Sequence, residues 1–385
     1  MWIKNRIASI VAAGAILGAA PVAAEVFSGR GSAMAGAGVA GGDYSYSALV
    51  NPATATNFKE NDDFALTLDF GVIANDQNEF IDTAEDLTDY LDEIDGMTAN
   101  QGDADFILDS LRALDQSRLT LDAGAQLTIA IPGSAVSGLL FVRQSAFIST
   151  EINLADADVE LLSNFGEQLF DENDLQSEAG AFGYSMREVG VAMARTFTFG
   201  EYQVSLGATP KHQQVETIEY IETVADFDDD DFEVDDYTLE HSNFNLDLGA
   251  TINWGELQGG LSVRNSLAQE YETLGGLKIQ LDPQVTAGFG YTGEVLTLLA
   301  DLDLNAVELF EGAGEVQVAR LGAEVDLFDW AQLRVGYRHD LKDTFDGAMT
   351  LGVGFSPFDV LQLHVSAIKS SDDTLGAAVQ FGIEL

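Results

Sequence analysis

Cysteine is absent from this chain of 385 residues, and positive charge is scarce, with 17 Lys and Arg against 64 Asp and Glu. Without thiols, disulfide bonds and thiolate-metal sites are excluded. The formal net charge of −47 repels nucleic acid and anionic membrane surfaces, so nucleic acid is not an expected partner. An acid excess of this size is typical of a surface that must stay hydrated in salty water.

Long apolar runs are also missing, with one exception at the N-terminus. Lys4 and Arg6 precede an apolar stretch over 7–17, and Val22-Ala23-Ala24 offers small residues for cleavage. This order predicts an export signal over 1–24 and a mature chain that starts at Glu25. The stretch is shorter than the roughly 20 apolar residues of a spanning helix, so we do not expect a retained anchor.

Apolar and polar residues alternate through the rest of the chain in segments of membrane-spanning length. In the last segment, Leu375, Val379, Phe381 and Leu385 share one face. Alternation with one apolar face predicts an all-β membrane protein, a roughly 14-stranded antiparallel transmembrane β-barrel. A soluble β-sandwich alternates too, but export and uniform segment length favour the barrel. The expected strands cover 63–74, 118–131, 137–152, 184–199, 201–224, 236–254, 257–271, 277–292, 294–306, 315–328, 330–341, 345–356, 358–369 and 374–385.

Connections between these segments alternate between short turns and longer loops, the longest at 75–117, 153–183 and 225–235. Outer-membrane barrels have short periplasmic turns and long outside loops, which places both termini at the periplasmic end. Trp254, Phe328, Trp330 and Phe358 lie at the short turns and predict an aromatic girdle there. The expected partners are outer-membrane lipid and the insertion machinery that recognises the last apolar row.

Helical spacing of apolar residues in the two longest loops predicts three short helices, near 81–94, 106–114 and 159–169. Their apolar faces either pack on one another over the barrel mouth or form a groove that captures an apolar ligand.

The segment 25–60 is not expected to be a strand. Its run from Ser28 to Gly42 is too rich in Gly and Ala for a regular element, and it leads into Asn51, Pro52 and Ala53. This order resembles the N-terminal hatch of the FadL family of outer-membrane transporters, where a small-residue segment and an Asn-Pro-Ala motif precede the first strand. It is also similar to the FadL-like barrels of the TraF conjugal-transfer type, which share the Gly-Arg-Gly start and an insertion after the first strand. The resemblance implies a lumen plug over 25–60 and a barrel over 61–385.

A barrel of this size has a lumen that inward side chains alone do not fill, so the amides of a plug need polar partners on the wall. Charged residues at inward positions predict a lumen charge network that clamps the plug. An alternative is a site for the anionic head group of a ligand. The predicted network comprises Asp247, Arg264, Asp301, Asp303, Arg320, Glu324, Arg334 and Arg338.

The pattern of outward-facing apolar residues slips by one position within the third segment. Leu139 and Phe141 are odd-numbered, whereas Ile148 and Ile152 are even-numbered. One extra residue is what a β-bulge inserts. Because FadL-like barrels are similar in having a strand irregularity with a lateral exit, the pattern predicts an opening at Arg143-Gln144-Ser145. A local bend without an opening is the alternative.

Other constellations predict no chemistry. Gly36, Gly38 and Gly41 match a dinucleotide fingerprint but follow no strand. The acidic run 226–236 lacks the spacing of an EF-hand, so a solvated loop is expected rather than calcium. The four histidines have no metal-ligand spacing and no nucleophile motif beside them. We therefore expect no catalytic residues, no metal, no cofactor and no enzyme activity.

These features predict a plugged channel in the outer membrane of a Gram-negative bacterium. The resemblance to FadL implies uptake of small hydrophobic or amphipathic molecules. Two alternatives stay open: a non-transporting, TraF-type envelope barrel that acts through its extracellular loops, and a general porin, which would need an open aqueous path.

Overall fold

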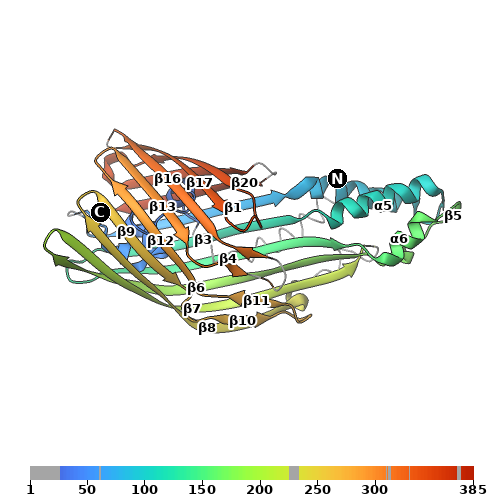
Figure 1. The fold of residues 1–385 in the computed structure, drawn as a ribbon, viewed down its shortest axis with the longest axis horizontal. Coiled ribbons are helices and arrows are strands. Elements are labelled where there is room, and N and C mark those ends of the chain that lie inside the picture. Colours follow the sequence, from blue (N-terminus) through green and yellow to red (C-terminus); the bar gives the residue numbers. More distant parts are fainter. Residues whose placement is uncertain are drawn as a thin grey trace.

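The computed structural model describes residues 27–59, 62–224, 234–308, 310, 314–328, 330–370 and 374–385. The predicted signal peptide and most of the acidic loop lie outside these ranges. Fourteen antiparallel strands form a closed barrel, as predicted (Figure 1). They are β1 (Ala65–Asp76), β3 (Leu119–Ile131), β4 (Ser137–Asn153), β6 (Glu178–Phe199), β7 (Tyr202–Thr223), β8 (Thr238–Trp254), β9 (Leu257–Arg264), β12 (Gln284–Thr292), β13 (Leu296–Asp303), β16 (Val318–Leu327), β17 (Ala331–Asp340), β18 (Ala348–Phe355), β19 (Leu361–Ser370) and β20 (Thr374–Glu384).

Alternation sets the two faces of each strand. In β20 the odd-numbered Leu375, Phe381 and Ile383 are exposed on the outer face, whereas Gln380 is buried in the lumen. β20 pairs with β1 from Ala65↔Glu384 to Asn75↔Thr374, and this pairing closes the barrel. The outer face is thus an apolar band of the kind that lipid requires. Exposed aromatic side chains gather at its short-turn edge, among them stacked Phe328 and Trp330, as the girdle prediction expected.

The wall is tall on one side and short on the other (Figure 1). β6 and β7 have 22 residues each, whereas β9 and β13 have 8. Two predicted strands, 257–271 and 277–292, were therefore too long. The chain leaves the wall at Asn265, which has φ 48° and donates its N–H to Asp247. The residues that follow form the hairpin of β10 (Gln269–Glu272) and β11 (Lys278–Leu281), which packs against the inner faces of β4, β6 and β7.

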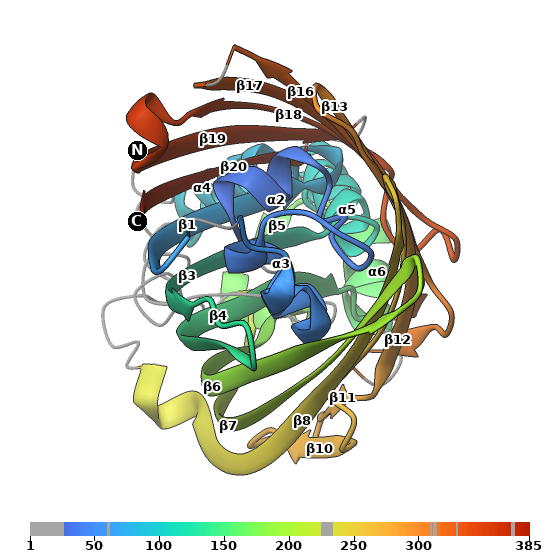
Figure 2. The same ribbon diagram turned by 90° about the vertical axis from the view of Figure 1, so that its left-hand side faces the viewer.

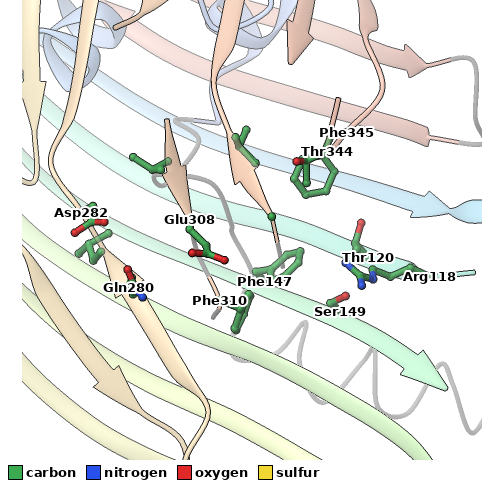
Figure 3. A pocket seen from close by; sticks show the side chains of 14 residues that line it. Arg118, Thr120, Phe147, Ser149, Gln280, Asp282, Glu308, Phe310, Thr344 and Phe345 are labelled. Carbon is green, nitrogen blue, oxygen red and sulfur yellow. The ribbon is translucent and has the colours of Figure 1, made fainter. Parts of the chain in front are cut away.

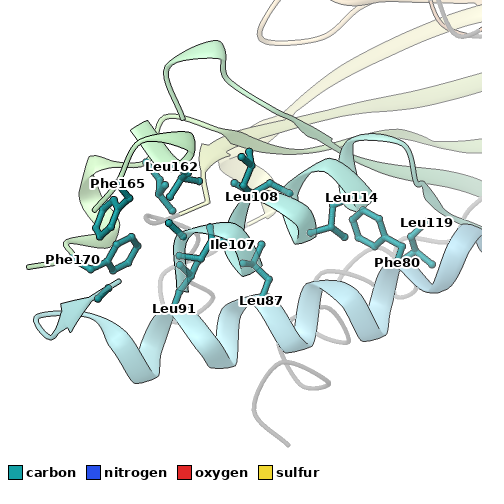
Figure 4. Close-up of a cluster of buried hydrophobic side chains, with 14 residues drawn as sticks. Phe80, Leu87, Leu91, Ile107, Leu108, Leu114, Leu119, Leu162, Phe165 and Phe170 are labelled. Atoms are coloured by element: carbon teal, nitrogen blue, oxygen red, sulfur yellow. The ribbon is translucent and has the colours of Figure 1, made fainter. Parts of the chain in front are cut away.

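A helical head projects beyond the tall side. It contains α4 (Phe80–Ile94), α5 (Gln101–Asp115) and α6 (Asp156–Ser163), with β2 (Thr98–Ala99) paired to β5 (Gln168–Leu169) and the short η2 (Gln77–Glu79) and η3 (Glu172–Asp174). The predicted loop helices are confirmed, although α6 ends before Phe165 and the second long loop ends earlier than predicted, because β6 begins at Glu178. Their apolar faces form one buried core around Ile107 and Leu111 (Figure 4). No helix in the described ranges has the length and apolar character needed to cross a membrane.

The remaining short elements are β14 (Val307–Glu308) paired with β15 (Glu315–Val316), η4 (Val234–Tyr237) after β7, and η5 (Pro357–Asp359) in the turn before β19. Viewed from the short-turn end, the N-terminal segment lies inside the barrel (Figure 2). It contains α2 (Gly29–Ala33), α3 (Tyr44–Val50) and η1 (Pro52–Thr56), and most of its side chains are buried.

The expectation that this Gly-rich run holds no regular element was wrong at α2. The Ser28 hydroxyl accepts the N–H of Gly31 and so caps the helix. This cap and the contacts with the barrel wall stabilise the helix, although its glycine residues disfavour it.

Candidate functional site

The Asn-Pro-Ala motif holds the plug together at its centre. The Asn51 amide donates to the carbonyl oxygens of Val39, at 2.6 Å, and of Ala250 on β8, at 3.3 Å. Its side-chain oxygen accepts the N–H of Ala53 at 3.1 Å, and Pro52 occupies the first turn of η1. Asn51 therefore joins both arms of the plug to the barrel wall, which gives the predicted motif a physical role.

Glycine pairs on the inner wall let the plug backbone approach closely. Gly207 and Gly249 are direct partners across β7 and β8, and the motif lies on them. A Cβ added to Gly207 would lie 2.4 Å from the backbone nitrogen of Ala53, closer than any side-chain carbon permits. Two more glycine pairs lie against plug backbone, namely Gly260 with Gly288 and Gly322 with Gly336, while the pair Gly71 and Gly124 lies against the ring of Phe27.

Charge holds one flank of the plug. Arg30 of α2 bonds the carboxylate of Asp43 at 3.1 Å and that of Glu324 on β16 at 2.7 Å. Glu324 also pairs with Arg334 of β17, whose guanidinium lies 3.0 Å from Nδ1 of His364. Glu324 and Arg334, two residues of the predicted lumen charge network, thus lie in one ion-paired group with Arg30 of the plug. Sequence reasoning missed Arg30 and Asp43, because the plug was expected to present only its backbone.

Two further predicted carboxylates act on the same flank. Asp301 accepts the backbone N–H groups of Gly38 at 2.8 Å and Val39 at 3.0 Å, so it binds the plug backbone directly. Asp303 bonds Arg320 at 2.9 Å and accepts from Gln284 at 3.0 Å. Arg264 donates to Gln284, which joins this second group.

Asp247 belongs to a buried cluster on β4, β6, β7 and β8. Lys211 bonds Asp247 at 2.9 Å and Glu188 at 3.0 Å, and Arg143 pairs with Glu188. The predicted network residues are therefore spread along the lumen wall. Glu324 and Arg334 lie beside α2, Asp303 and Arg320 lie beside Gln284, and Asp247 lies beside Lys211. Arg338 lines a chamber above the plug, directly opposite Arg320 on the neighbouring strand.

The predicted opening at Arg143-Gln144-Ser145 is wrong. β4 is paired to β3 without interruption from Gly138↔Ile131 to Thr150↔Leu119. It is also paired to β6 along its whole length. Arg143 and Ser145 face the lumen, where both are buried. Gln144 faces outward, but its side-chain amide has hydrogen-bond partners on β6: it donates to Ser185 at 2.8 Å and accepts from Arg187 at 3.1 Å.

The apparent phase slip has another cause, an apolar inner wall. Leu139 and Phe141 face the lumen and pack against plug residues such as Tyr46 and Leu49. Higher on the same wall, Tyr184 and Met186 face inward against the β10–β11 hairpin. Odd-numbered residues of β4 therefore face inward. Hydrophobicity alone wrongly placed Leu139 and Phe141 on the outer face of the barrel.

Above the plug, two hollows follow one another: the outer one lies between β3, β4, β11, β14 and β15, and the inner one is lined by strands around the lumen, from β1 and β3 to β16 and β17. The outer hollow measures about 50 Å³ and has Phe147, Phe310 and Phe345 in its walls (Figure 3). The chamber beneath it measures about 130 Å³ and ends on Tyr46 and Val50 of the plug. Both hollows are lined by Thr120, Val316 and Phe345, so they are neighbours along one path.

Below the plug lies a third and much larger hollow, the vestibule, of about 820 Å³. It reaches the exposed turn residues Glu294 and Phe328, and Arg30 and Tyr44 of the plug form part of its lining. Across the described ranges, no three His, Asp or Glu side chains gather in a way that could hold a metal ion.

Solved structures with the same fold include a hydrocarbon channel and a FadL homologue. A "TodX deltaS2S3 mutant monoaromatic hydrocarbon channel" matches with TM-score 0.59 and 10% identity, over 94% of this chain and 100% of that one. The P. putida toluene transporter TodX gives TM-score 0.56 and 10% identity, over 94% and 99%. A Pseudomonas aeruginosa FadL homologue gives TM-score 0.50 and 10% identity, over 93% and 97%. At this identity the likeness establishes the FadL-like fold.

Among curated proteins, no sequence matches. A family model does match, over residues 48–303, which is well over half of the chain. That range starts in the plug and runs through β13, so it covers the helical head as well as much of the barrel. The chain belongs to the family described as "F plasmid transfer operon, TraF, protein".

Proposed function

We propose that this protein is a plugged outer-membrane channel that admits small hydrophobic or amphipathic molecules from the outside. The observation that carries the proposal is the pair of hollows that share Thr120, Val316 and Phe345 and end on the plug. In this orientation the short turns and the C-terminus face the periplasm, and the helical head faces outward.

The size and lining of the hollows support a small cargo. An apolar cavity of about 150 Å³ holds benzene, and the chamber above the plug is of similar volume, about 130 Å³. Three phenylalanines wall the outer hollow, with Arg118, Asp282 and Glu308 among its other lining residues, whereas Arg264, Arg320 and Arg338 line the chamber below. A molecule that moves from the first to the second passes from more apolar to more polar walls, which suits an aromatic or amphipathic compound.

A blocking substitution tests the path. Thr120→Trp places a large ring where the two hollows meet, while Ala123→Trp places the same ring on the outer face of the same strand. We expect Thr120→Trp to reduce toluene uptake by cells that produce the protein at least fivefold, and Ala123→Trp to leave it unchanged. Equal uptake by both variants and the parent would argue against transport along this path.

The helical head favours a second candidate function, a conjugation-associated envelope barrel. The head has a hydrophobic core of its own and does not depend on a ligand to cover its apolar faces. Both of its loops leave the barrel at paired residues, Asp76↔Leu119 and Asn153↔Glu178. Replacing 77–118 and 154–177 by short Gly-Ser turns therefore removes the head and keeps the strands.

The headless protein separates the two functions. If the head acts in conjugation, mating frequency falls while toluene uptake persists. If the channel is the function, uptake responds to Thr120→Trp and mating is unaffected by either change.

A further inference from the structure

The chamber above the plug contains a buried carboxylate oxygen that has no hydrogen-bond partner. Asp301 on β13 lines the chamber and is 4% exposed. One of its oxygens, Oδ2, accepts the N–H groups of Gly38 and Val39 of the plug. The other, Oδ1, accepts from no group in the described part of the chain. A buried acceptor without a partner is costly, so this atom favours a ligand that brings a hydrogen-bond donor.

A second acceptor in the chamber also has no partner. The side-chain oxygen of Asn75 on β1 belongs to the same lining and accepts from no described group. β1 and β13 are not neighbours in the barrel, because β16, β17, β18, β19 and β20 lie between them. Hydrogen-bond donors are therefore in short supply on two separate walls of the chamber.

The charges around the chamber nearly balance. Among the described residues of the lining, the cations are Arg264, Arg320 and Arg338, and the carboxylates are Asp122, Asp301, Asp340 and Asp346. An anionic ligand is attracted by the guanidinium groups but repelled by the carboxylates, and the reverse holds for a cationic ligand. The chamber therefore suits a neutral ligand better than an ion of either sign.

Arg320 brings hydrogen-bond donors to the strand beside Asp301. The two residues are direct partners across β13 and β16, and both line the chamber. The side chain of Arg320 also reaches the plug, since a Cβ added to Gly36 would lie 3.7 Å from its Nε. One nitrogen of its guanidinium bonds Asp303, and a guanidinium carries five N–H donors in all. An acceptor and a set of donors thus lie on adjacent strands at the plug end of the chamber.

A hydroxyl group can serve both of these residues at once. Its hydrogen is donated to a carboxylate, while its oxygen accepts an N–H of a guanidinium. A carboxylate ligand only accepts and an ammonium group only donates, so neither can serve both. We propose that the chamber binds a neutral aromatic molecule with a hydroxyl group, a phenol, whose hydroxyl donates to Oδ1 of Asp301 and accepts from Arg320.

The rest of the lining suits the aromatic ring. Val39, Tyr46 and Val50 of the plug, with Ile73 and Val318 of the wall, supply apolar surface around the chamber. Its volume of about 130 Å³ is close to the ~150 Å³ of an apolar cavity that holds benzene. A phenolic hydroxyl ionises at about pH 10, so the molecule is neutral at physiological pH. The inference rests on the proposed channel function and deepens it by naming the class of cargo.

Uptake of phenol and of toluene by cells tests the assignment, because the two molecules have nearly the same shape. Channel-dependent uptake is the initial rate with the parent protein minus the rate with Thr120→Trp, which blocks the path. At equal concentrations we expect this uptake to be at least fivefold faster for phenol than for toluene. A chamber that selects by apolar contact alone gives the reverse order, since toluene is the more hydrophobic molecule. Anisole, whose ether oxygen accepts but cannot donate, should enter no faster than toluene.

Asp301→Asn removes the acceptor and keeps the shape of the side chain. Gly38 and Val39 of the plug need an acceptor, so the amide oxygen takes the place of Oδ2 and the amide NH₂ takes the place of Oδ1. The ratio of phenol uptake to toluene uptake should fall at least fivefold. Asp326→Asn makes the same chemical change on β16 in the vestibule below the plug, and should change the ratio less than twofold.

A second variant and a direct measurement keep the assignment testable if Asp301→Asn displaces the plug. Arg320→Met removes the donors at similar side-chain length and should lower the uptake ratio about threefold. Isothermal titration of the purified full-length protein in detergent should show phenol binding that Asp301→Asn weakens at least fivefold and Asp326→Asn leaves within twofold. Equal amounts of heat-modifiable folded protein in the outer membrane show that the variants are compared in folded form.

Four results would overturn the proposal. Channel-dependent uptake that favours toluene would keep the channel function and remove this cargo class. Equal changes of the uptake ratio in Asp301→Asn and Asp326→Asn would have the same consequence. Faster channel-dependent uptake of benzoate than of phenol would assign the chamber to an anionic head group. Equal uptake of every compound by the parent and Thr120→Trp would remove the channel function itself, and this inference with it.

Discussion

The two flanks of the plug are held by different forces. Toward β1, β3, β4 and β6 the plug buries apolar side chains against Leu139, Phe141 and small alanines. Toward β13, β16 and β17 it is held by Asp301, Glu324 and the cations around them. Burial of apolar side chains stabilises the plug on the first flank but does not fix its orientation, because the hydrophobic effect is not directional. The ion pairs on the charged flank do fix its orientation, but the loss of one partner there leaves a buried, unpaired charge, which is costly.

This difference also explains for which strands the sequence predicts the inward and outward faces correctly. On the charged flank, inward residues are polar and the outer face is apolar, so the strand phase is plain. On the apolar flank both faces of β4 and β6 are apolar, so the direction of Leu139 could not be read from hydrophobicity.

Removing the shared carboxylate of the charged flank should have the largest effect. Glu324→Ala leaves Arg30 and Arg334 buried without their common partner, and breaking a buried pair costs about 4 kcal/mol. We expect a lower temperature for loss of the folded band on gels and larger single-channel conductance in planar bilayers. Glu324→Gln keeps the shape and part of the hydrogen bonding and should be milder; equal behaviour of the two variants would speak against the charged clamp.

A cavity on the apolar flank should rank next. Leu139 is 1% exposed, and Leu139→Ala should destabilise by about 3 kcal/mol through lost burial and the void left behind. Leu140→Ala, one position along on the exposed outer face, is the matched control and should cost far less. Because no charge is uncovered, conductance should rise less than for Glu324→Ala, and the change should not depend on salt concentration.

The glycine seats are shared by both flanks and should give a smaller, local effect. Gly207→Ala places a methyl group against the backbone of Ala53, and overpacking of this kind costs about 2 kcal/mol. Gly138→Ala on β4 meets no atom within 4 Å and should be neutral. Accessibility of a cysteine introduced at Thr56 to a thiol reagent measures displacement of the plug. Equal labelling in the two alanine variants would refute close seating.

The smallest effect lies in the head, away from both flanks. The hydroxyl of Tyr90 donates to Asp103 at 2.6 Å, which raises the pKa of Tyr90 from 10.0 to about 12 and lowers that of Asp103 below 3.8. For Tyr90 this contribution to stability is complete below pH 10 and is lost as pH rises through about 12. For Asp103 it is present above pH 3.8 and is lost as pH falls through the lowered value.

Tyrosinate absorbance follows this contact directly. The difference spectrum between the parent and Tyr90→Phe isolates the single tyrosine. In the Asp103→Asn background we expect its midpoint to move back toward 10. A midpoint that stays near 12 would mean that Asp103 is not the cause.

Much of the barrel could be predicted from the sequence because lipid imposes one simple rule on every strand. The fourteen strands, the inward positions of Glu324 and Arg334, and helices α4 and α5 all follow from periodicity of a single segment. The predicted opening at Gln144 failed because it depended on which face of β4 is covered by the plug, a contact between residues far apart in sequence.

The glycine pairs that seat the plug could not be predicted from the sequence either, because their role also depends on contacts between distant segments. Gly207 and Gly249 appear in the sequence only as small residues on the polar face of a strand. Their importance lies in pairing across β7 and β8 directly beneath the Asn-Pro-Ala motif. Inward glycines recurring on successive strands were the one available signal, and recognising it required knowing that something compact lies against the wall.

The tall side of the barrel sets how far the head stands from the membrane. A strand of 22 residues such as β6 is about 70 Å long at ~3.3 Å per residue. Tilted by about 40°, it rises roughly 55 Å, against an apolar band about 25 Å tall. In the proposed orientation, a cell or particle that approaches from outside therefore meets the helical head before it comes within reach of the pore.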